Sequence, residues 1–184
     1  MFTNEEIDHI IDVKLKIKSK LESVFAGPWS SVYLPWEKVF LSGGAIASLI
    51  QGEEPKDWDF YFEDLYAMGK FYEDIKSNHM SSVKDVDPKY AQFVGQDGKM
   101  ITANAITMKD MTSFIVMIAM DPPHVKKTFD YKHCTAHFSL RDDKLYISPE
   151  VYRAAKNKKL IVNNQHGLKP WREEKFLSRG YTKS

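Results

Sequence analysis

The chain has 184 residues, of which 43% are hydrophobic and 28% are charged, and this balance excludes intrinsic disorder and indicates a globular protein with a substantial core. Its formal net charge is +1, so no overall positive field would attract nucleic acid, and any basic surface must be local. The single cysteine, Cys134, excludes an internal disulfide and a cysteine-rich zinc site.

Two features of the sequence bear on location. The first ten residues lack the basic segment and apolar run that mark an export signal. The longest strongly apolar stretch, Phe114 to Met120, is far shorter than the roughly 20 residues that span a bilayer, and it is typical of a buried strand. We therefore expect a cytoplasmic protein with no membrane segment.

A long first helix is predicted from about Asn4 to Val24. Thr3 and Glu6 have the spacing of a capping box, which satisfies free N–H groups at the start of a helix. This helix would bury one apolar stripe, formed by Ile7, Ile10, Ile11, Ile17, Leu21 and Val24. Gly27 and Pro28 then break the chain.

The next segment has the pattern strand, glycine turn, helix, strand, helix. A short apolar strand at Val39 to Leu41 runs into Ser42-Gly43-Gly44, and a helix follows over Ala45 to Gln51. The second strand is Trp58 to Phe62 and the second helix of this segment is Leu65 to Ser77. That helix should face the core with Leu65, Met68, Phe71, Tyr72 and Ile75.

Further strands and helices complete the predicted domain. The strands are Gln92 to Gly95, Met100 to Met108, Ser113 to Met120, Cys134 to Leu140 and Lys144 to Ile147, with turns at Gln96 to Gly98 and Arg141 to Asp143. The helices are Asp121 to Thr128, Pro149 to Lys156 and Pro170 to Ser178. We therefore predict one domain of the α/β (α+β) class, a mixed β-sheet flanked by helices: an N-terminal helix and loop (1–38), a core (39–148) and a short helical tail (149–184).

Two carboxylates on the second strand suggest a metal site. Side chains two apart on a strand share a face, so Asp57 and Asp59 project together while Trp58 and Phe60 face the core. Neighbouring carboxylates repel unless a cation lies between them. Mg²⁺, or Mn²⁺, suits this position, because such hard ions bind carboxylates together with substrate phosphates.

The glycine turn supplies the second half of the constellation. Gly43 and Gly44 stand between a strand and a helix, where the absence of side chains lets a phosphate approach free backbone N–H groups. Twelve residues separate Gly44 from Asp57. If neighbouring strands bring the turn and the carboxylates together, they would hold a nucleoside triphosphate with its metal ions.

These residues carry a resemblance to a known superfamily. The run from Leu41 to Phe62, LSGGAIASLIQGEEPKDWDFYF, resembles the signature of the DNA polymerase beta superfamily of nucleotidyltransferases, closest to the head of transfer-RNA nucleotidyltransferases and to small bacteriophage proteins. Looser similarity to the phage proteins extends over Thr102 to Thr107, Phe129 to Cys134 and Arg172 to Tyr181. The resemblance covers about Val39 to Tyr181.

The resemblance implies a two-metal site with a bound triphosphate. Asp57 and Asp59 would hold two Mg²⁺ or Mn²⁺ ions, and a third carboxylate is expected on a later strand. Asp130 is the first choice, with Asp85 and Asp87 as alternatives, although Asp130 could instead cap a turn. Nucleotide contacts are expected from Ser42, Gly43, Gly44, Lys56, Asn104, Arg172 and Lys175.

The reaction implied is transfer of a nucleoside monophosphate from a triphosphate to a hydroxyl of an RNA end, a protein or a small molecule. Addition of CCA is not expected, because Ile46-Ala47-Ser48 and Lys99-Met100-Ile101 replace motifs of those enzymes and their long helical body is missing. The alternative is a non-catalytic nucleotide-binding or partner-binding module of the same fold, used in phage infection. A chance likeness in one motif would instead leave Asp57 and Asp59 far from the glycine turn.

Several other polar residues have two interpretations. One side of the last helix carries three aligned cations, Arg172, Lys175 and Arg179. Together with Arg153, Lys156, Lys158 and Lys159 they could contact a triphosphate or a nucleic-acid backbone. The alternative is that they form an ordinary solvated face. Asn104 could point into the site or bridge strands. His133 and Cys134 would point to opposite faces of a strand, which favours a core cysteine beside a hydrogen-bonded histidine over a metal pair. The oligomeric state stays open.

Overall fold

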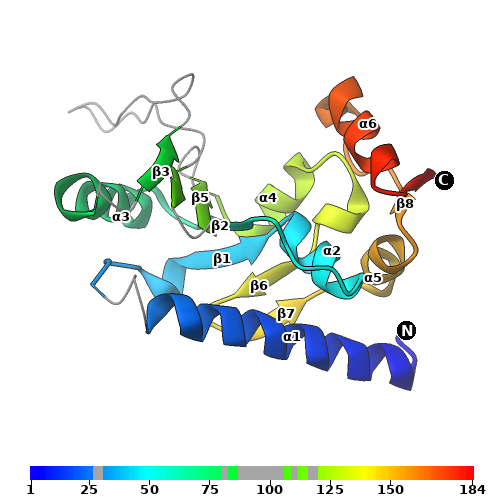
Figure 1. The fold of residues 1–184 in the computed structure, drawn as a ribbon, viewed down its shortest axis with the longest axis horizontal. Coiled ribbons are helices and arrows are strands. Elements are labelled where there is room, and N and C mark those ends of the chain that lie inside the picture. The colour runs from blue at the N-terminus through cyan, green and yellow to red at the C-terminus, as the bar shows by residue number, and fades with distance from the viewer. Residues whose placement is uncertain (27–30, 80–82, 87–105, 109–111, 116–119) are drawn as a thin grey trace.

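The computed structural model describes residues 1–26, 31–79, 83–86, 106–108, 112–115 and 120–184, which form a sheet with helices packed around it (Figure 1). The α-helices are α1 (Asn4–Phe25), α2 (Gly44–Ile50), α3 (Leu65–Asn78), α4 (Pro122–Thr128), α5 (Pro149–Lys156) and α6 (Pro170–Ser178). Short 3₁₀ turns are η1 (Trp36–Lys38), η3 (Lys132–Cys134) and η4 (Gln165–Gly167). None of these helices has the length and apolar character that crossing a bilayer requires.

The described strands form one large mixed sheet and one small one. The strands are β1 (Val39–Ser42), β2 (Trp58–Phe62), β3 (Val83–Val86), β4 (Ile106–Met108), β5 (Thr112–Ile115), β6 (His137–Ser139), β7 (Lys144–Tyr146), β8 (Lys159–Leu160) and β9 (Thr182–Lys183). The large sheet has the order β3-β4-β5-β2-β1-β6-β7, with β2 and β5 parallel and the other neighbours antiparallel. Strands β8 and β9 pair in parallel near the C-terminus. The predicted mixed α/β fold is therefore confirmed.

Helix α1 begins as its capping box predicts. The backbone N–H of Glu6 donates to Thr3 Oγ1 at 3.1 Å, and that of Thr3 donates to Glu6 Oε1 at 2.9 Å. The buried face consists of Val13, Ile17, Leu21 and Val24. Ile7 and Ile11, however, are 43% and 51% exposed, so the predicted stripe is wrong in its first turns. There the helix instead turns Glu6 and His9 toward α5, where they contact Arg153 and Tyr152.

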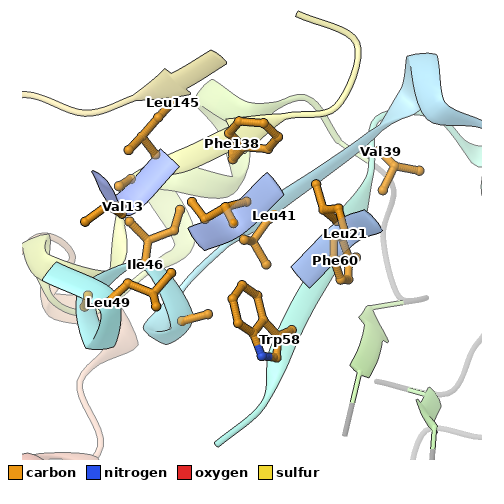
Figure 2. Packing of buried hydrophobic residues seen from close by; sticks show 14 of the residues in the cluster. Val13, Leu21, Val39, Leu41, Ile46, Leu49, Trp58, Phe60, Phe138 and Leu145 are labelled. Carbon is orange, nitrogen blue, oxygen red and sulfur yellow. The ribbon is translucent and has the colours of Figure 1, made fainter. Parts of the chain in front are cut away.

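The main core lies between the sheet and helices α1, α2, α3 and α5. All four residues of β1 are buried, and β2 buries Trp58, Phe60 and Phe62, with Asp59 and Tyr61 alternating on its other face. Figure 2 shows the side chains gathered in this core, among them Val13, Leu21, Val39, Leu41, Ile46, Leu49, Trp58, Phe60, Phe138 and Leu145. Since the apolar positions of β2 point into this core, Asp59 is directed to the opposite side.

Some predicted elements differ from the structure. The proposed strand over Cys134 to Leu140 is wrong in its first half, because η3 precedes β6 and Thr135 Oγ1 closes the turn on Lys132 O at 2.7 Å. Leu65, predicted to face the core, is 42% exposed. The predicted strand 92–95 and the predicted turn 96–98 lie outside the described residues. Strands β4 and β5 coincide with parts of the predicted strands 100–108 and 113–120. Strands β3, β8 and β9 were not predicted.

Candidate active site

One cleft of about 640 Å³ brings together most of the residues that the sequence singled out. The turn after β1 contributes Gly43 and Gly44, and the start of β2 contributes Asp57 and Asp59. Asp130 lies on the segment before η3 and also lines the cleft. Helix α6 and its two end residues contribute a group of cations that we call the basic set: Lys169, Arg172, Lys175 and Arg179. The glycine turn, the three carboxylates and the basic set therefore share one cleft.

The glycine turn lies directly beside Asp59. Gly43 has φ 90° and ψ −147°, a conformation that only glycine adopts without strain. A Cβ on Gly43 would lie 3.8 Å from Asp59 Oδ2, whereas one on Gly44 would meet no atom within 4 Å. Gly44 therefore leaves its backbone open to the cleft. Ser42, expected to contact nucleotide, is buried and donates from Oγ to Ala136 O at 2.7 Å, away from the residues that line the cleft.

The carboxylates of β2 lie in different surroundings. Asp57 is exposed just before the strand, and Asp59 is partly buried within it. Burial, and then the negative charge of Asp57, raise the pKa of Asp59 to about 7, although Lys175 and Arg172 oppose this shift. At pH values above 7 the ionised carboxylate is thus poorly solvated and sits beside another negative charge. A divalent cation would remove both penalties.

Asp130 reaches the cleft but already has a strong partner. Arg172 donates from Nε to Asp130 Oδ2 at 2.5 Å and from Nη2 to Oδ1 at 3.2 Å. The backbone N–H of Tyr131 donates to the same Oδ1 at 3.0 Å. The segment leads into η3 rather than into a strand as predicted. Within the part of the chain that the structure describes, no three His, Cys, Asp or Glu side chains are grouped so that they could hold a metal.

Of the other predicted positions, one lines the cleft, and the rest are separated from it or lie outside the described residues. Asp85 lies on β3, and β4 and β5 stand between β3 and β2 in the sheet. Asp87 and Asn104 lie outside the described residues. Lys56 does line the cleft. The sequence reasoning overlooked Tyr61 and Lys169, which line it as well; Tyr61 follows Asp59 by two residues on β2, and that spacing was the available signal.

The basic set crowds positive charge along α6. Burial, followed by the charges of Arg179 and Arg172, lowers the pKa of Lys175. An anion in the cleft would relieve this repulsion. The remaining predicted cations, Arg153, Lys156, Lys158 and Lys159, are not among the residues that line the cleft. Three of them donate elsewhere: Arg153 to Glu6 at 2.9 Å, Lys158 to Glu53 at 2.8 Å and Lys159 to Thr182 at 2.9 Å.

Contacts from distant parts of the chain hold α6 in place. Lys158 Nζ donates to Glu53 Oε1 at 2.8 Å and to Arg179 O at 3.0 Å. Gln51 Nε2 donates to Tyr181 Oη at 2.5 Å and to Ala155 O at 3.0 Å. Beneath these bonds lies a second buried cluster, composed of Tyr131, Cys134, Leu160, Phe176 and Tyr181. The basic set is therefore carried by a packed element.

Cys134 belongs to this buried cluster and also lines the cleft, and the ring of His133 lies beside the aromatic members of the cluster. Burial raises the pKa of Cys134 to about 12, so its thiol stays protonated near neutral pH. Burial lowers the pKa of His133 to about 4. Contrary to expectation, neither ring nitrogen of His133 has a hydrogen-bond partner among the described residues, and the ring lies 4.6 Å from those of Phe176 and Tyr181. The imidazole of His133 and the thiol of Cys134 are therefore both uncharged near neutral pH.

Solved structures with a similar fold are enzymes that act on transfer RNA. A Thermotoga maritima CCA-adding enzyme complexed with tRNA is 18% identical, with a TM-score of 0.53, and the match covers 80% of this chain and 35% of that one. A tRNA nucleotidyltransferase with a primer tRNA and an incoming ATP analogue is 15% identical (TM-score 0.53; 80% and 43%), and a tRNA-processing enzyme with CTP is 17% identical (TM-score 0.53; 80% and 40%). The match thus covers between 35% and 43% of the length of these enzymes. At these identities the likeness establishes a nucleotidyltransferase-type fold.

Comparison of the sequence with protein-family models identifies the family of the chain. No curated protein matches it in sequence. A family model described as "Gabija anti-defense 2 family protein" matches residues 5–158, which include the glycine turn, Asp57, Asp59 and Asp130 but not α6. Because this match extends over most of the chain, the protein belongs to the Gabija anti-defense 2 family.

Proposed function

We propose that this protein is a metal-dependent nucleotidyltransferase that transfers a nucleoside monophosphate from a nucleoside triphosphate to a hydroxyl group. The observation that carries the proposal is the single cleft in which Gly43, Gly44, Asp57 and Asp59 meet the basic set. The fold supports it, since similar structures are named for complexes with CTP and with an ATP analogue. A chance likeness in one motif would have left the turn far from Asp59, whereas a Cβ on Gly43 would lie 3.8 Å from Asp59 Oδ2.

The carboxylates are suited to hold the metal ions. Asp57 and Asp59 offer oxygen ligands at one end of β2, and burial together with the charge of Asp57 raises the pKa of Asp59 despite the opposing charges of Lys175 and Arg172. Asp130 is our third ligand. Bound Mg²⁺ or Mn²⁺, two ions with the triphosphate, would polarise the acceptor hydroxyl and neutralise the departing pyrophosphate.

The remaining lining residues would bind and orient the triphosphate. The open backbone at Gly43 and Gly44 admits a phosphate group, and Lys56, Arg172 and Lys175 supply positive charge around it. In the reaction the acceptor oxygen bonds to the α-phosphorus, the bond to the β-phosphate oxygen breaks, and pyrophosphate and the hydroxyl proton are released. Lys56, Arg172 and Lys175 would favour this step by stabilising the negative charge that develops on the departing pyrophosphate.

The comparisons with known proteins bear on the acceptor and on the biological role. An RNA end, a protein hydroxyl and a small molecule all remain candidate acceptors, and the RNA end has the support of the similar structures that contain tRNA. The family name points to a role against the Gabija defence, in the cytoplasm of an infected host. A non-catalytic module of the same fold is the second candidate, and it is favoured by the engagement of Asp130 with Arg172.

A label-transfer assay tests the enzyme directly. The protein is incubated with α-labelled nucleoside triphosphates, Mg²⁺ or Mn²⁺, and separate pools of RNA, protein and metabolites, and both label transfer and pyrophosphate release are followed. Asp59→Asn should lower the rate at least about a hundredfold, which corresponds to about 2.7 kcal/mol in the barrier. Asp12→Asn makes the same chemical change on an exposed part of α1 and should leave the rate unaltered.

A binding measurement separates the two candidates. Mg²⁺ with a triphosphate should raise the melting temperature of the wild-type protein through linkage, and the Asp57→Asn, Asp59→Asn double variant should lose that gain. Tight binding with no label moved to any pool, with either metal, would establish the non-catalytic module. An equal rise in the wild type and the double variant would refute the assignment of these two metal ligands.

A further inference from the structure

The ion pair between Asp130 and Arg172 occupies the oxygens that a third metal ligand would need. The Asp130 side chain is only 3% exposed, while that of Arg172 is 26% exposed and faces the cleft. Arg172 bonds to both carboxylate oxygens, and Tyr131 N takes a further position on Oδ1. Three of the roughly four acceptor positions of this carboxylate are therefore taken, and a cation at the remaining one would be repelled by the adjacent guanidinium.

Neither partner of this pair can be released without a replacement. A buried carboxylate that loses its counter-charge is strongly destabilised, and so is a partly buried guanidinium. A divalent cation could replace Arg172 at Asp130. For Arg172 the matching replacement is a phosphate group, because the planar guanidinium binds phosphate and carboxylate through the same two-pronged geometry.

Aromatic rings and further cations surround Arg172 at the edge of the cleft. Its guanidinium carbon lies 5.3 Å from the ring centre of Phe176 and 5.7 Å from that of Trp171, so aromatic faces support the group beside the cleft. Lys175 and Arg179 follow on the same helix and also line the cleft. A triphosphate drawn to these cations would meet Arg172 within the same basic set.

We propose that Arg172 is a positioning residue that exchanges partners: it holds Asp130 in the free protein and a triphosphate oxygen in the complex, which releases Asp130 to a divalent cation. This inference rests on the proposed nucleotidyltransferase function. It makes the binding of metal and nucleotide cooperative, since each ligand removes the cost that the other meets when it binds alone. The second metal site would then form only when the triphosphate is present.

Two single variants test the exchange from opposite sides. With Mn²⁺ alone, followed by electron paramagnetic resonance, Arg172→Gln should bind the ion about tenfold more tightly than the wild type, because Asp130 is no longer occupied. With a non-hydrolysable triphosphate alone, in EDTA and followed by calorimetry, Asp130→Asn should bind about tenfold more tightly than the wild type, because Arg172 is already free. A purely structural ion pair would give losses in both experiments.

The controls separate failure of the exchange from failure of the function. The double variant Asp130→Asn, Arg172→Gln should show neither gain. If Arg172→Gln does not fold, Arg172→Lys takes its place. Because lysine keeps the charge but loses the two-pronged guanidinium, Arg172→Lys should show a smaller gain in Mn²⁺ affinity. If the wild type binds the analogue with Mn²⁺ but neither single variant shows a gain, the exchange is overturned and the function stands. If the wild type binds no analogue even with Mn²⁺, both are overturned.

The wild-type protein offers a measurement that needs no variant. The Nε–H resonance of Arg172 in a ¹⁵N-labelled sample reports the bond to Asp130. Adding the analogue with Mg²⁺ should shift this resonance, while Mg²⁺ alone should leave it in place. A resonance that stays unchanged when the analogue is bound would overturn the exchange.

Discussion

Replacing Asp59 by asparagine should change how the stability of the metal-free protein depends on pH. The pKa of Asp59 is raised from 3.8 to about 7, first by burial and then by the charge of Asp57. Between these values the folded protein holds a proton that the unfolded chain releases, so stability is highest at low pH and falls as pH rises toward 7. The amide side chain of the Asp59→Asn variant cannot ionise, so this part of the pH dependence disappears.

The expected size follows from the pKa. The interval from pH 5 to a pKa of about 7 is about two units, at about 1.4 kcal/mol each, so the wild type should lose about 2.7 kcal/mol more than Asp59→Asn between pH 5 and pH 8. For a chain of this length that corresponds to about 5 to 11 °C in melting temperature. Urea unfolding of both proteins in EDTA, at several pH values across this range, measures the difference.

A second variant checks the cause of the shift. Asp57→Asn removes the neighbouring charge but leaves Asp59 buried, so its effect should have the same sign and be smaller than that of Asp59→Asn. The histidines are present in all three proteins, so their contributions to the pH dependence cancel in the comparison. Parallel stability curves for the wild type and Asp59→Asn would refute the reasoning.

Two further changes test the turn and the aromatic region. Gly43→Ala should lower the free energy of unfolding in urea by about 1–3 kcal/mol, because the φ of Gly43 is 90°. Gly44→Ala should change it by less than about 0.5 kcal/mol yet weaken triphosphate binding. Equal stability of the two variants would contradict the strain argument. His133→Phe removes two buried nitrogens without partners among the described residues and should raise stability by about 1–3 kcal/mol. Folding lowers the pKa of His133 from 6.5 to about 4, so the wild type loses stability as pH drops through that window. The stability gained by His133→Phe should therefore be larger at pH 5 than at pH 8. A variant that is less stable than the wild type at both pH values would show that packing of the imidazole ring dominates.

Local patterns were sufficient to predict much of the fold. The capping box at Thr3 and Glu6 predicted the start of α1, and the alternation of large apolar and polar residues predicted β2 to the residue. The buried face of α1 was predicted less well, since Ile7 and Ile11 have the right spacing but the helix is rotated by its contacts with α5. Helical periodicity identifies an apolar stripe, but neighbouring elements decide which of its turns is covered.

The candidate site divides in the same way. The glycine turn and the pair Asp57 and Asp59 could be predicted because the chemistry lies within a few residues of one strand. The contribution of Arg172 and Lys175 to the cleft agrees with their spacing along a helix. The bond between Asp130 and Arg172, which are 42 residues apart, could not be predicted, because sequence shows an acid and a base without showing that tertiary packing joins them.

The way in which α6 is fastened has a consequence for folding kinetics. Gln51 and Tyr181 are separated by 130 residues, and Lys158 Nζ and Glu53 by 105, so each of these bonds closes a long loop of chain. Closing such loops costs more entropy than forming local helices and hairpins, and proteins rich in such contacts fold slowly. The glycine turn and β2 are close in sequence and can assemble early. The cationic part of the cleft should therefore be the last to form, and an intermediate that lacks it would expose Asp57 and Asp59 with no facing positive charge.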